Sequence, residues 1–184
     1  MNDFPYHTVE TAPEDAKPIL EIAEKAFGMT PNLLRKMAEA PALLEGYWQL
    51  KEVFSNSSLS PIEQQVVLIA ASASNSCTYC VSVHSVLADM TKVPGEATEA
   101  LRNGQTIPDA RLEALRQFTQ SMVENRGWVP DAEVQAFLDA GFTRTQALEV
   151  VLGVGFKTLS NYANHLVESE LDPAFQSRAW KPST

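Results

Sequence analysis

The stretch "LSPIEQQVVLIAASASNSCTYCVSVHSVLA", residues 59–88, holds an almost uninterrupted apolar run and both cysteines of the chain. Ser60 belongs to the residue types that cap helices, and proline, here Pro61, is favoured at a first helical position. The apolar residues 66–71 follow inside this helix. A helix that is apolar on most of its sides is usually buried. We therefore expect residues 61–74 to form a helix in the centre of an all-α fold.

The polar residues 74–76 interrupt that helix, and Ser76 is expected to cap a second helix that starts at Cys77. Cys80 follows three residues later and His84 another four, so all three side chains lie along one helix face. The first helical turn favours a thiolate through its unpaired N–H groups and the helix dipole. His84 adds a hydrogen-bond donor or, when protonated, a positive charge. The pattern predicts a thiol pKa below the ordinary value of roughly 8.5.

Three other roles compete with a redox centre. A structural disulfide is disfavoured because closing a loop of about four residues contributes only ~2 kcal/mol, and the expected compartment is reducing. Structural zinc needs four ligands, and besides this trio only His7 and His165 remain to contribute. The third alternative is a pair of buried, inert cysteines beside a core histidine. The spacing of the trio on one helix face favours the redox interpretation.

The rest of the chain is predicted to form helices that begin near proline and end at glycine, as is typical of helix boundaries. The last helix is expected to start at a capping Thr143 and to end before Pro173. We expect one domain over residues 1–184, with an irregular tail at 172–184. The predicted helices outside the opening stretch are 13–28, 30–40, 41–54, 94–104, 108–127, 130–141 and 143–169.

Charge and composition limit the function classes. Fourteen basic and 23 acidic residues give a net charge of −9, which disfavours nucleic acid or an anionic membrane surface as a partner. No apolar run approaches the ~18 residues that a membrane span needs. Residues 1–17 show no basic segment followed by an apolar one, as a secretion signal would. We therefore expect a soluble, cytoplasmic protein.

The opening stretch resembles the core of the carboxymuconolactone decarboxylase superfamily. Its C-x-x-C-x-x-x-H pattern after an apolar helix is similar to the AhpD-type alkylhydroperoxidase branch, and "GMTPNLLRKMAEAPALLEGYWQL", residues 28–50, resembles the segment before this core in peroxidase-related members. The resemblance covers about residues 13–168. It implies an AhpD-like helical bundle with a central C-x-x-C helix. The decarboxylases proper typically lack the cysteine pair, so lactone chemistry is not expected.

The resemblance implies a thiol-dependent alkylhydroperoxidase or disulfide reductase that acts in antioxidant defence. Cys80 would be the peroxidatic cysteine, which a hydroperoxide oxidises to a sulfenic acid. Cys77 would resolve that acid to a disulfide, and His84 would assist proton movement at Cys80. The implied partners are a hydroperoxide substrate, a thioredoxin-like or lipoyl-dithiol reductant, and further copies of the chain in a trimer or hexamer. No bound cofactor or metal is required.

Two positions depart from the family pattern. The family's proton relay uses a glutamate twelve positions before the first cysteine, where this chain has Gln65, an amide that does not titrate. The AhpD peroxidases carry histidine just before the second cysteine, where this chain has Tyr79. Glu63 is near in sequence but points about 200° away on the helix. Glu149 and His165 on the last helix are further relay candidates, although a solvated glutamate and a capping or core histidine are the simpler roles.

The departure at Gln65 favours a second hypothesis, a redox-sensing or structural oligomer whose dithiol changes state without turnover. A zinc-binding module is a third. For Trp180, which lies in a polar tail, we expect docking on a neighbouring subunit.

Overall fold

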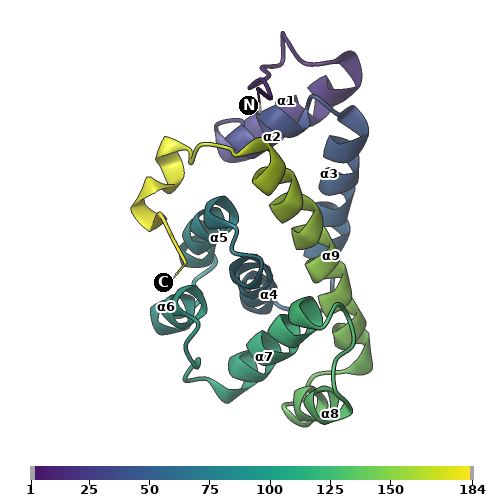
Figure 1. Cartoon of the computed structure of the whole chain (residues 1–184), viewed down its shortest axis with the longest axis vertical. Helices are drawn as coiled ribbons and strands as arrows, with labels where there is room; N and C mark the ends of the chain where they lie inside the picture. Colours follow the sequence, from purple (N-terminus) through teal and green to yellow (C-terminus); the bar gives the residue numbers. More distant parts are fainter. Residues whose placement is uncertain (1–2, 183–184) are drawn as a thin grey trace.

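The computed structural model describes residues 3–182, which form nine α-helices and two short 3-10 helices without a strand. Figure 1 shows α4 in the middle of the bundle, with α5, α7 and α9 around it. Within the described residues, no helix has both the length and the apolar character needed to cross a membrane. The all-α class expected from the sequence is confirmed. The elements are η1 (Glu14–Ala16), α1 (Lys17–Phe27), α2 (Asn32–Met37), α3 (Pro41–Ser55), α4 (Pro61–Ser74), α5 (Thr78–Met90), α6 (Gly95–Asn103), α7 (Ala110–Glu124), α8 (Asp131–Asp139), α9 (Arg144–Val167) and η2 (Pro173–Arg178).

Helix α4 forms the centre of the molecule, as its apolar sequence predicts. Every side chain from Val66 to Ser72 is buried, and α4 contacts α5, α6, α7 and α9. Burial of one large aliphatic side chain stabilises a fold by roughly 1.5–3 kcal/mol. Most of the sides of α4 therefore contribute to the core, and the neighbouring helices are held against it.

Two apolar clusters fill the interior. The larger one surrounds α4 with residues of α6, α7 and α8. The smaller one lies mainly among α1, α2 and α3, and it includes Cys77, Tyr79 and Cys80 from the start of α5. Helix α9 contacts α2, α3, α4 and α5. The cysteine pair is thus enclosed where the first three helices meet α5 and α9.

Helices α4 and α9, which pack beside the cysteine pair, start as the sequence predicts. The Ser60 side chain accepts a hydrogen bond from the backbone N–H of Glu63, whose carboxylate accepts one from the backbone of Ser60 in return. Thr143 and Gln146 form the same reciprocal box at the start of α9. Such boxes satisfy backbone N–H groups that a helix start leaves without partners.

The start of α5 differs from the expected one. Ser76 does not cap the helix, because its backbone takes a left-handed conformation with φ of 54°. Cys77 is the cap residue instead, and its backbone N–H donates to the carbonyl of Ser72 at 2.9 Å. The helix therefore begins at Thr78, and Cys80 lies in its first turn. The break between α4 and α5 places Cys77 directly against the end of the central helix.

Gly153 sets how closely α9 approaches the core. A Cβ atom at this position would lie 2.6 Å from the Phe54 ring on α3 and 2.8 Å from Val67 on α4. These distances are shorter than side-chain contacts allow, so only glycine fits. The close approach holds the next turn of α9, including Lys157, against α4 and α5.

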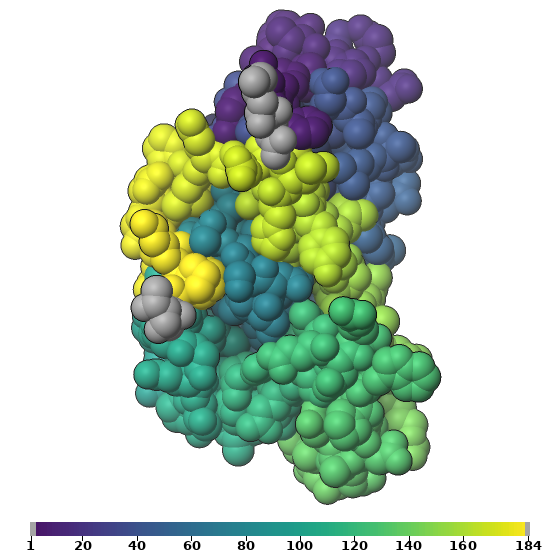
Figure 2. All heavy atoms as spheres, viewed as in Figure 1, coloured from purple at the N-terminus to yellow at the C-terminus, as the bar shows by residue number. Residues whose placement is uncertain are grey.

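The C-terminal segment is more ordered than the irregular tail that the sequence suggests. It contains η2, and Arg178 in that helix pairs with Asp89 of α5 and Glu99 of α6. Trp180 docks on its own chain, since its indole N–H donates to the Arg102 carbonyl and its backbone N–H to Ser82. Figure 2 shows this segment in yellow, packed along the edge of the molecule. These contacts hold Trp180 on its own chain, and docking on a neighbouring subunit stays a prediction.

Candidate active site

The two cysteines are buried and not bonded to each other. Cys77 has no exposed surface and Cys80 is 2% exposed. Their positions at the cap and in the first turn of α5 place both thiols between this helix and α9. The burial means that a reagent reaches Cys80 only through a cavity or a local opening.

A polar face of α9 is turned toward the cysteine pair. Lys157, Ser160, Asn161 and Asn164 lie at helical spacing of three, one and three residues, and each is at most 6% exposed. Asn164 donates its side-chain N–H to the sulfur of Cys77 at 3.7 Å. This face supplies hydrogen-bond donors and one positive charge to an otherwise apolar interior.

The surroundings of the two thiols separate their pKa values. Burial acts to raise the pKa of Cys80, but a hydrogen bond from the Cys77 side chain and the charge of Lys157 outweigh it, with help from Asn161 and Ser160. Together they lower the pKa of Cys80 to about 6. The pKa of Cys77 is raised, because its thiol donates to Cys80 and because it is buried. At pH 7 the arrangement favours a thiolate on Cys80 and a thiol on Cys77.

His84 bridges α4 and α9 through its two ring nitrogens. Nδ1 lies 3.1 Å from the Oε1 of Gln65, and Nε2 lies 3.0 Å from the Nζ of Lys157. An ammonium only donates and an amide oxygen only accepts. These partners assign the neutral tautomer, with the proton on Nδ1 and the lone pair of Nε2 facing Lys157. The pKa of His84 is well below its ordinary value, first through burial and then through the Lys157 charge.

The source of positive charge therefore differs from the one expected. The sequence suggests that His84 lowers the thiol pKa as a hydrogen-bond donor or as a protonated cation, whereas the structure has a neutral His84 and places the charge on Lys157. Lys157 is 2% exposed, and no ion pair within the described residues involves it. A buried ammonium without a counter-charge is costly. The Cys80 thiolate is the anion positioned to balance it.

The other relay candidates are held in contacts of their own. The Tyr79 hydroxyl donates to Asp172 at 2.7 Å and accepts from the backbone of α2. Glu63 belongs to the cap of α4 and pairs with an arginine of α7. Glu149 accepts two hydrogen bonds from the loop before α4, and His165 is exposed and stacks on a tyrosine. Of the five candidates, Gln65 alone contacts His84.

A cavity of about 140 Å³ opens beside this site. Gln65 and His84 line it together with aromatic and aliphatic side chains from α1, α2, α3, α4, α5, α9 and η2. His84 is 7% exposed, while Phe27 on the outer side is 41% exposed. The cavity therefore leads from the surface to Tyr79 and His84, which flank Cys80 on α5, while neither cysteine is among its lining residues.

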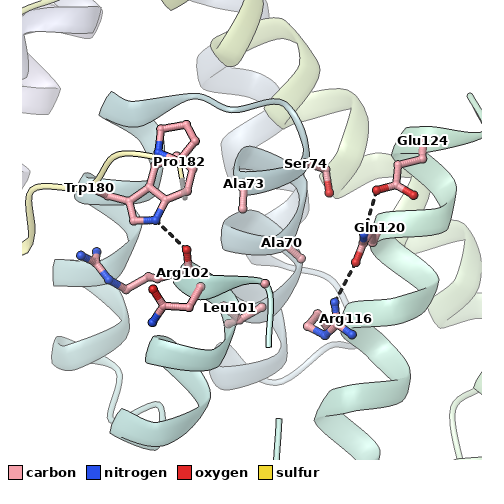
Figure 3. A pocket seen from close by; sticks show the side chains of 12 residues that line it. Ala70, Ala73, Ser74, Leu101, Arg102, Arg116, Gln120, Glu124, Trp180 and Pro182 are labelled. Carbon is pink, nitrogen blue, oxygen red and sulfur yellow. Dashed lines mark hydrogen bonds between the residues drawn. The ribbon is translucent and has the colours of Figure 1, made fainter. Parts of the chain in front are cut away.

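A larger cavity, of about 310 Å³, lies between α4, α6, α7 and the C-terminal segment. Figure 3 shows the polar groups of its lining. The Trp180 indole donates a hydrogen bond to the Arg102 carbonyl, and the Gln120 side chain accepts one from Arg116 and donates one to Glu124. It contains none of Cys77, Cys80 and His84. The larger cavity is therefore separate from the thiol site.

Within residues 3–182, no three His, Cys, Asp or Glu side chains gather closely enough to hold a metal ion. His165 lies on the exposed side of α9, and His7 pairs with Glu39 near the N-terminus. The ligand set that a zinc module needs is not assembled by these side chains.

The fold and the site define a class, an all-α protein with a buried dithiol and a stabilised thiolate. Residues 40–121 match the family model described as the carboxymuconolactone decarboxylase family. No curated protein sequence matches the chain.

Solved structures share the fold over nearly the whole chain. An AhpD-core, peroxidase-related protein from Ralstonia eutropha JMP134 is 20% identical, with a TM-score of 0.85 and 97% of each chain covered. A peroxidase-related protein from Silicibacter sp. TM1040 is 19% identical, with a TM-score of 0.81 and 96% of this chain and 93% of that one covered. The debrominase Bmp8 in complex with 2,3,4-tribromopyrrole is 15% identical, with a TM-score of 0.81 and coverage of 97% and 96%. The chain therefore has the AhpD-like all-α fold, and its residues 40–121 are similar to the carboxymuconolactone decarboxylase family.

Proposed function

We propose that the protein is a thiol-dependent peroxidase that cycles between the Cys77–Cys80 dithiol and its disulfide. The observation that carries this proposal is the separation of the two pKa values, which favours a thiolate on Cys80 and keeps the proton on Cys77. A thiolate is the nucleophilic form of cysteine. Once Cys80 is oxidised, its negative charge no longer opposes ionisation of Cys77, and the Cys77 thiolate is the group that converts the first oxidation product into a disulfide.

The proposed cycle consists of attack on the peroxide, protonation of the leaving alkoxide, disulfide formation and reduction of the disulfide. The Cys80 thiolate attacks the outer oxygen of a hydroperoxide, the O–O bond breaks, and a sulfenic acid and an alkoxide form. The alkoxide takes a proton and leaves as an alcohol. Cys77 then attacks the sulfenic sulfur as a thiolate, and the proton it has given up joins the leaving hydroxide, so water is released and the Cys77–Cys80 disulfide forms. A thioredoxin-like or lipoyl dithiol restores both thiols by exchange and is itself oxidised to a disulfide.

The proton for the alkoxide is assigned to Tyr47. This tyrosine lines the cavity, and its pKa is raised by burial and by the nearby Cys80 charge, so it is protonated at pH 7. No hydrogen bond within the described residues engages its hydroxyl. His84 acts on Lys157, because its neutral Nε2 accepts from the ammonium and fixes it in place. Gln65 holds His84 in the required tautomer.

The experiment that tests the proposal is alkylation mass spectrometry of the reduced protein before and after one equivalent of cumene hydroperoxide. We expect both cysteines to be lost together as one intramolecular disulfide, at a rate well above that of a free thiol. If both cysteines remain alkylatable at the free-thiol rate, the peroxidase proposal fails. The homo-oligomer, trimer or hexamer, and the cytoplasmic location stay predictions, of which light scattering tests the first.

A redox sensor that does not turn over is the second candidate. The observation that favours it is the amide of Gln65, which does not pass a proton onward from His84. A sensor forms the disulfide once and is not reduced by a small dithiol at a useful rate. Repeated peroxide consumption with excess dihydrolipoamide would exclude this candidate.

Halogenated aromatic rings are a second candidate substrate class. Two observations support it: the fold is shared with a debrominase, and aromatic side chains line the cavity. Such a reaction would convert an aryl bromide and two thiols into the unsubstituted ring, bromide, a proton and the Cys77–Cys80 disulfide. Release of bromide from 2,3,4-tribromopyrrole, measured beside peroxide consumption, would decide between the two substrates.

A further inference from the structure

We propose that the cavity beside Cys80 binds a compact apolar molecule that carries one anionic group, and that Lys51 holds this group at the cavity mouth. The inference deepens the proposed function by naming the class of its substrate. It rests on that function only in calling the occupant a substrate, since binding to the cavity is a separate property.

The size and the lining of the cavity select an apolar body. The volume is about 140 Å³, close to the ~150 Å³ apolar cavity that holds one benzene molecule. The walls are therefore suited to a single ring or a short branched chain. The apolar and aromatic lining residues are Phe27, Pro31, Leu33, Leu34, Tyr47, Trp48, Phe54, Leu68, Tyr79, Val83, Leu87, Phe156 and Phe175.

The charge of the lining selects an anion. No aspartate or glutamate lines the cavity, although the chain carries 23 acidic residues and a net charge of −9. Lys51 is the lysine in the lining, and neutral His84 at the inner end adds no charge. Behind His84 lies the ammonium of Lys157. Both ends of the cavity are thus positive or neutral, and an anion enters without meeting a carboxylate.

Lys51 is placed for this role. Its ammonium lies 4.3 Å from the Trp48 ring centre and 5.9 Å from that of Phe27, two rings that also line the cavity. No ion pair within the described residues involves Lys51. The adjacent Glu52 accepts a hydrogen bond from the Trp48 indole. The ammonium is therefore held at the rim by aromatic faces, with its charge available to a bound anion.

An occupant bound in this way is oriented for reaction. Its anionic group faces Lys51 on α3, and its apolar body lies against the aromatic walls. Its far end points toward the α5 residues beside Cys80, including Tyr79, Val83 and His84. A hydroperoxide that carries a carboxylate at the opposite end from its O–O bond fits this description.

The test compares benzoate with benzamide, its uncharged analogue of nearly equal shape, by calorimetry on the reduced protein without peroxide. We expect benzoate to bind at least about tenfold more tightly, which corresponds to ~1.4 kcal/mol. Lys51→Met should bring benzoate to the affinity of benzamide, while Lys51→Arg should keep most of the preference. Lys25→Met, at an exposed lysine of α1 outside the cavity, is the matched control and should change nothing.

A second measurement places the ligand in the cavity. Saturating benzoate should slow alkylation of Cys80 by iodoacetamide in the parent protein and in Lys25→Met, but not in Lys51→Met. Equal affinity for benzoate and benzamide, or a preference that survives in Lys51→Met, would overturn the inference. If benzoate binds as expected but no hydroperoxide oxidises Cys80, the proposed function fails and the anion site stands.

Discussion

The cavity beside the thiol site and the larger one near the C-terminal segment, two of the cavities in the described part of the chain, treat charge in opposite ways. In the larger one, the Arg116 guanidinium makes two hydrogen bonds to Glu113, at 2.6 and 2.8 Å, and a third to Gln120. Arg102 donates to Ser85 and to backbone carbonyls of the C-terminal segment. Each of these cations is held by acceptors of its own chain, so the larger cavity offers little to an incoming anion.

The smaller cavity and the thiol site behind it lack carboxylate acceptors, and Lys157 donates to the neutral His84 ring instead. Lys51 and Lys157 take part in no ion pair within residues 3–182, and no carboxylate lines the cavity. Unpaired buried or half-buried cations lower the free energy of anions that form or bind beside them. Pairing of charge, rather than cavity size, therefore distinguishes the proposed thiol site and its cavity from the larger cavity, whose cations are already bound by the chain.

The largest effect is expected from removing the nucleophile. Cys80→Ser should reduce peroxide consumption to the uncatalysed rate, because a serine hydroxyl is not ionised at pH 7. Cys77→Ser should still allow the first oxidation but should stop at the sulfenic acid, which dimedone labelling and mass spectrometry detect. Steady-state turnover in Cys80→Ser would show that the carboxylate-free region is not where the chemistry occurs.

Removing the buried cation should have the next largest effect. Lys157→Met keeps a similar length but removes the charge that favours the thiolate, so the pKa of Cys80 should rise by at least one unit. The iodoacetamide rate of Cys80 at pH 6 should then fall by at least about fivefold, because the thiolate fraction drops from about one half to about one eleventh. Lys157→Arg is the charge-conserving control. An unchanged rate profile in Lys157→Met would mean that hydrogen bonds from Cys77, Asn161 and Ser160 stabilise the thiolate without the charge.

The pH dependence of Cys80 alkylation in the parent protein follows from the same charges. Below the pKa Cys80 is a thiol, and above it a thiolate, so the alkylation rate should rise with pH around a midpoint of about 6. The rate should fall by about tenfold from pH 7 to pH 5 and should change little from pH 7.5 to pH 8.5. A free cysteine peptide, measured in parallel, should still be accelerating in the upper range. A profile that matches the peptide would remove the basis for a reactive thiolate.

Adding a carboxylate to the smaller cavity should pair its charges more as those of the larger cavity are paired. Gln65→Glu places a carboxylate at the position that contacts His84, and a carboxylate there should raise the pKa of His84 by favouring the imidazolium. The Lys157 charge is then shared with the new anion, so the pKa of Cys80 should rise by roughly half a unit and its alkylation at pH 6 should slow by about twofold. NMR titration of the His84 ring checks the first effect. A His84 pKa that does not move would contradict the assigned contact.

The sequence was informative where structure depends on local interactions. The start of α4 at Ser60 and Pro61 and the start of α9 at Thr143 follow from capping chemistry within a few residues. The common face of Cys80 and His84 follows from helical spacing alone. The cap of α5 shifted from Ser76 to Cys77, because the break after the central helix forces Ser76 into a left-handed conformation that no local signal indicated.

The residues that the sequence analysis missed come from distant packing. Lys157 is 73 positions from His84, and their contact depends on the close approach of α9 that Gly153 allows. One signal was present: Lys157, Ser160, Asn161 and Asn164 repeat at helical spacing in a largely apolar helix. Such a polar stripe on a buried helix needs a polar partner. The identity of that partner, the cysteine pair, requires the tertiary structure.

The smallest effect is expected in the larger cavity. Glu124 is exposed and accepts a hydrogen bond from Gln120 at its rim. Glu124→Gln removes a charge there without touching the thiol site, so the free energy of unfolding should change by less than about 0.5 kcal/mol. The Cys80 alkylation profile should overlay that of the parent protein at every pH. A shifted midpoint would show that charges in the two cavities are coupled, and the contrast between a structural and a reactive region would then have to be given up.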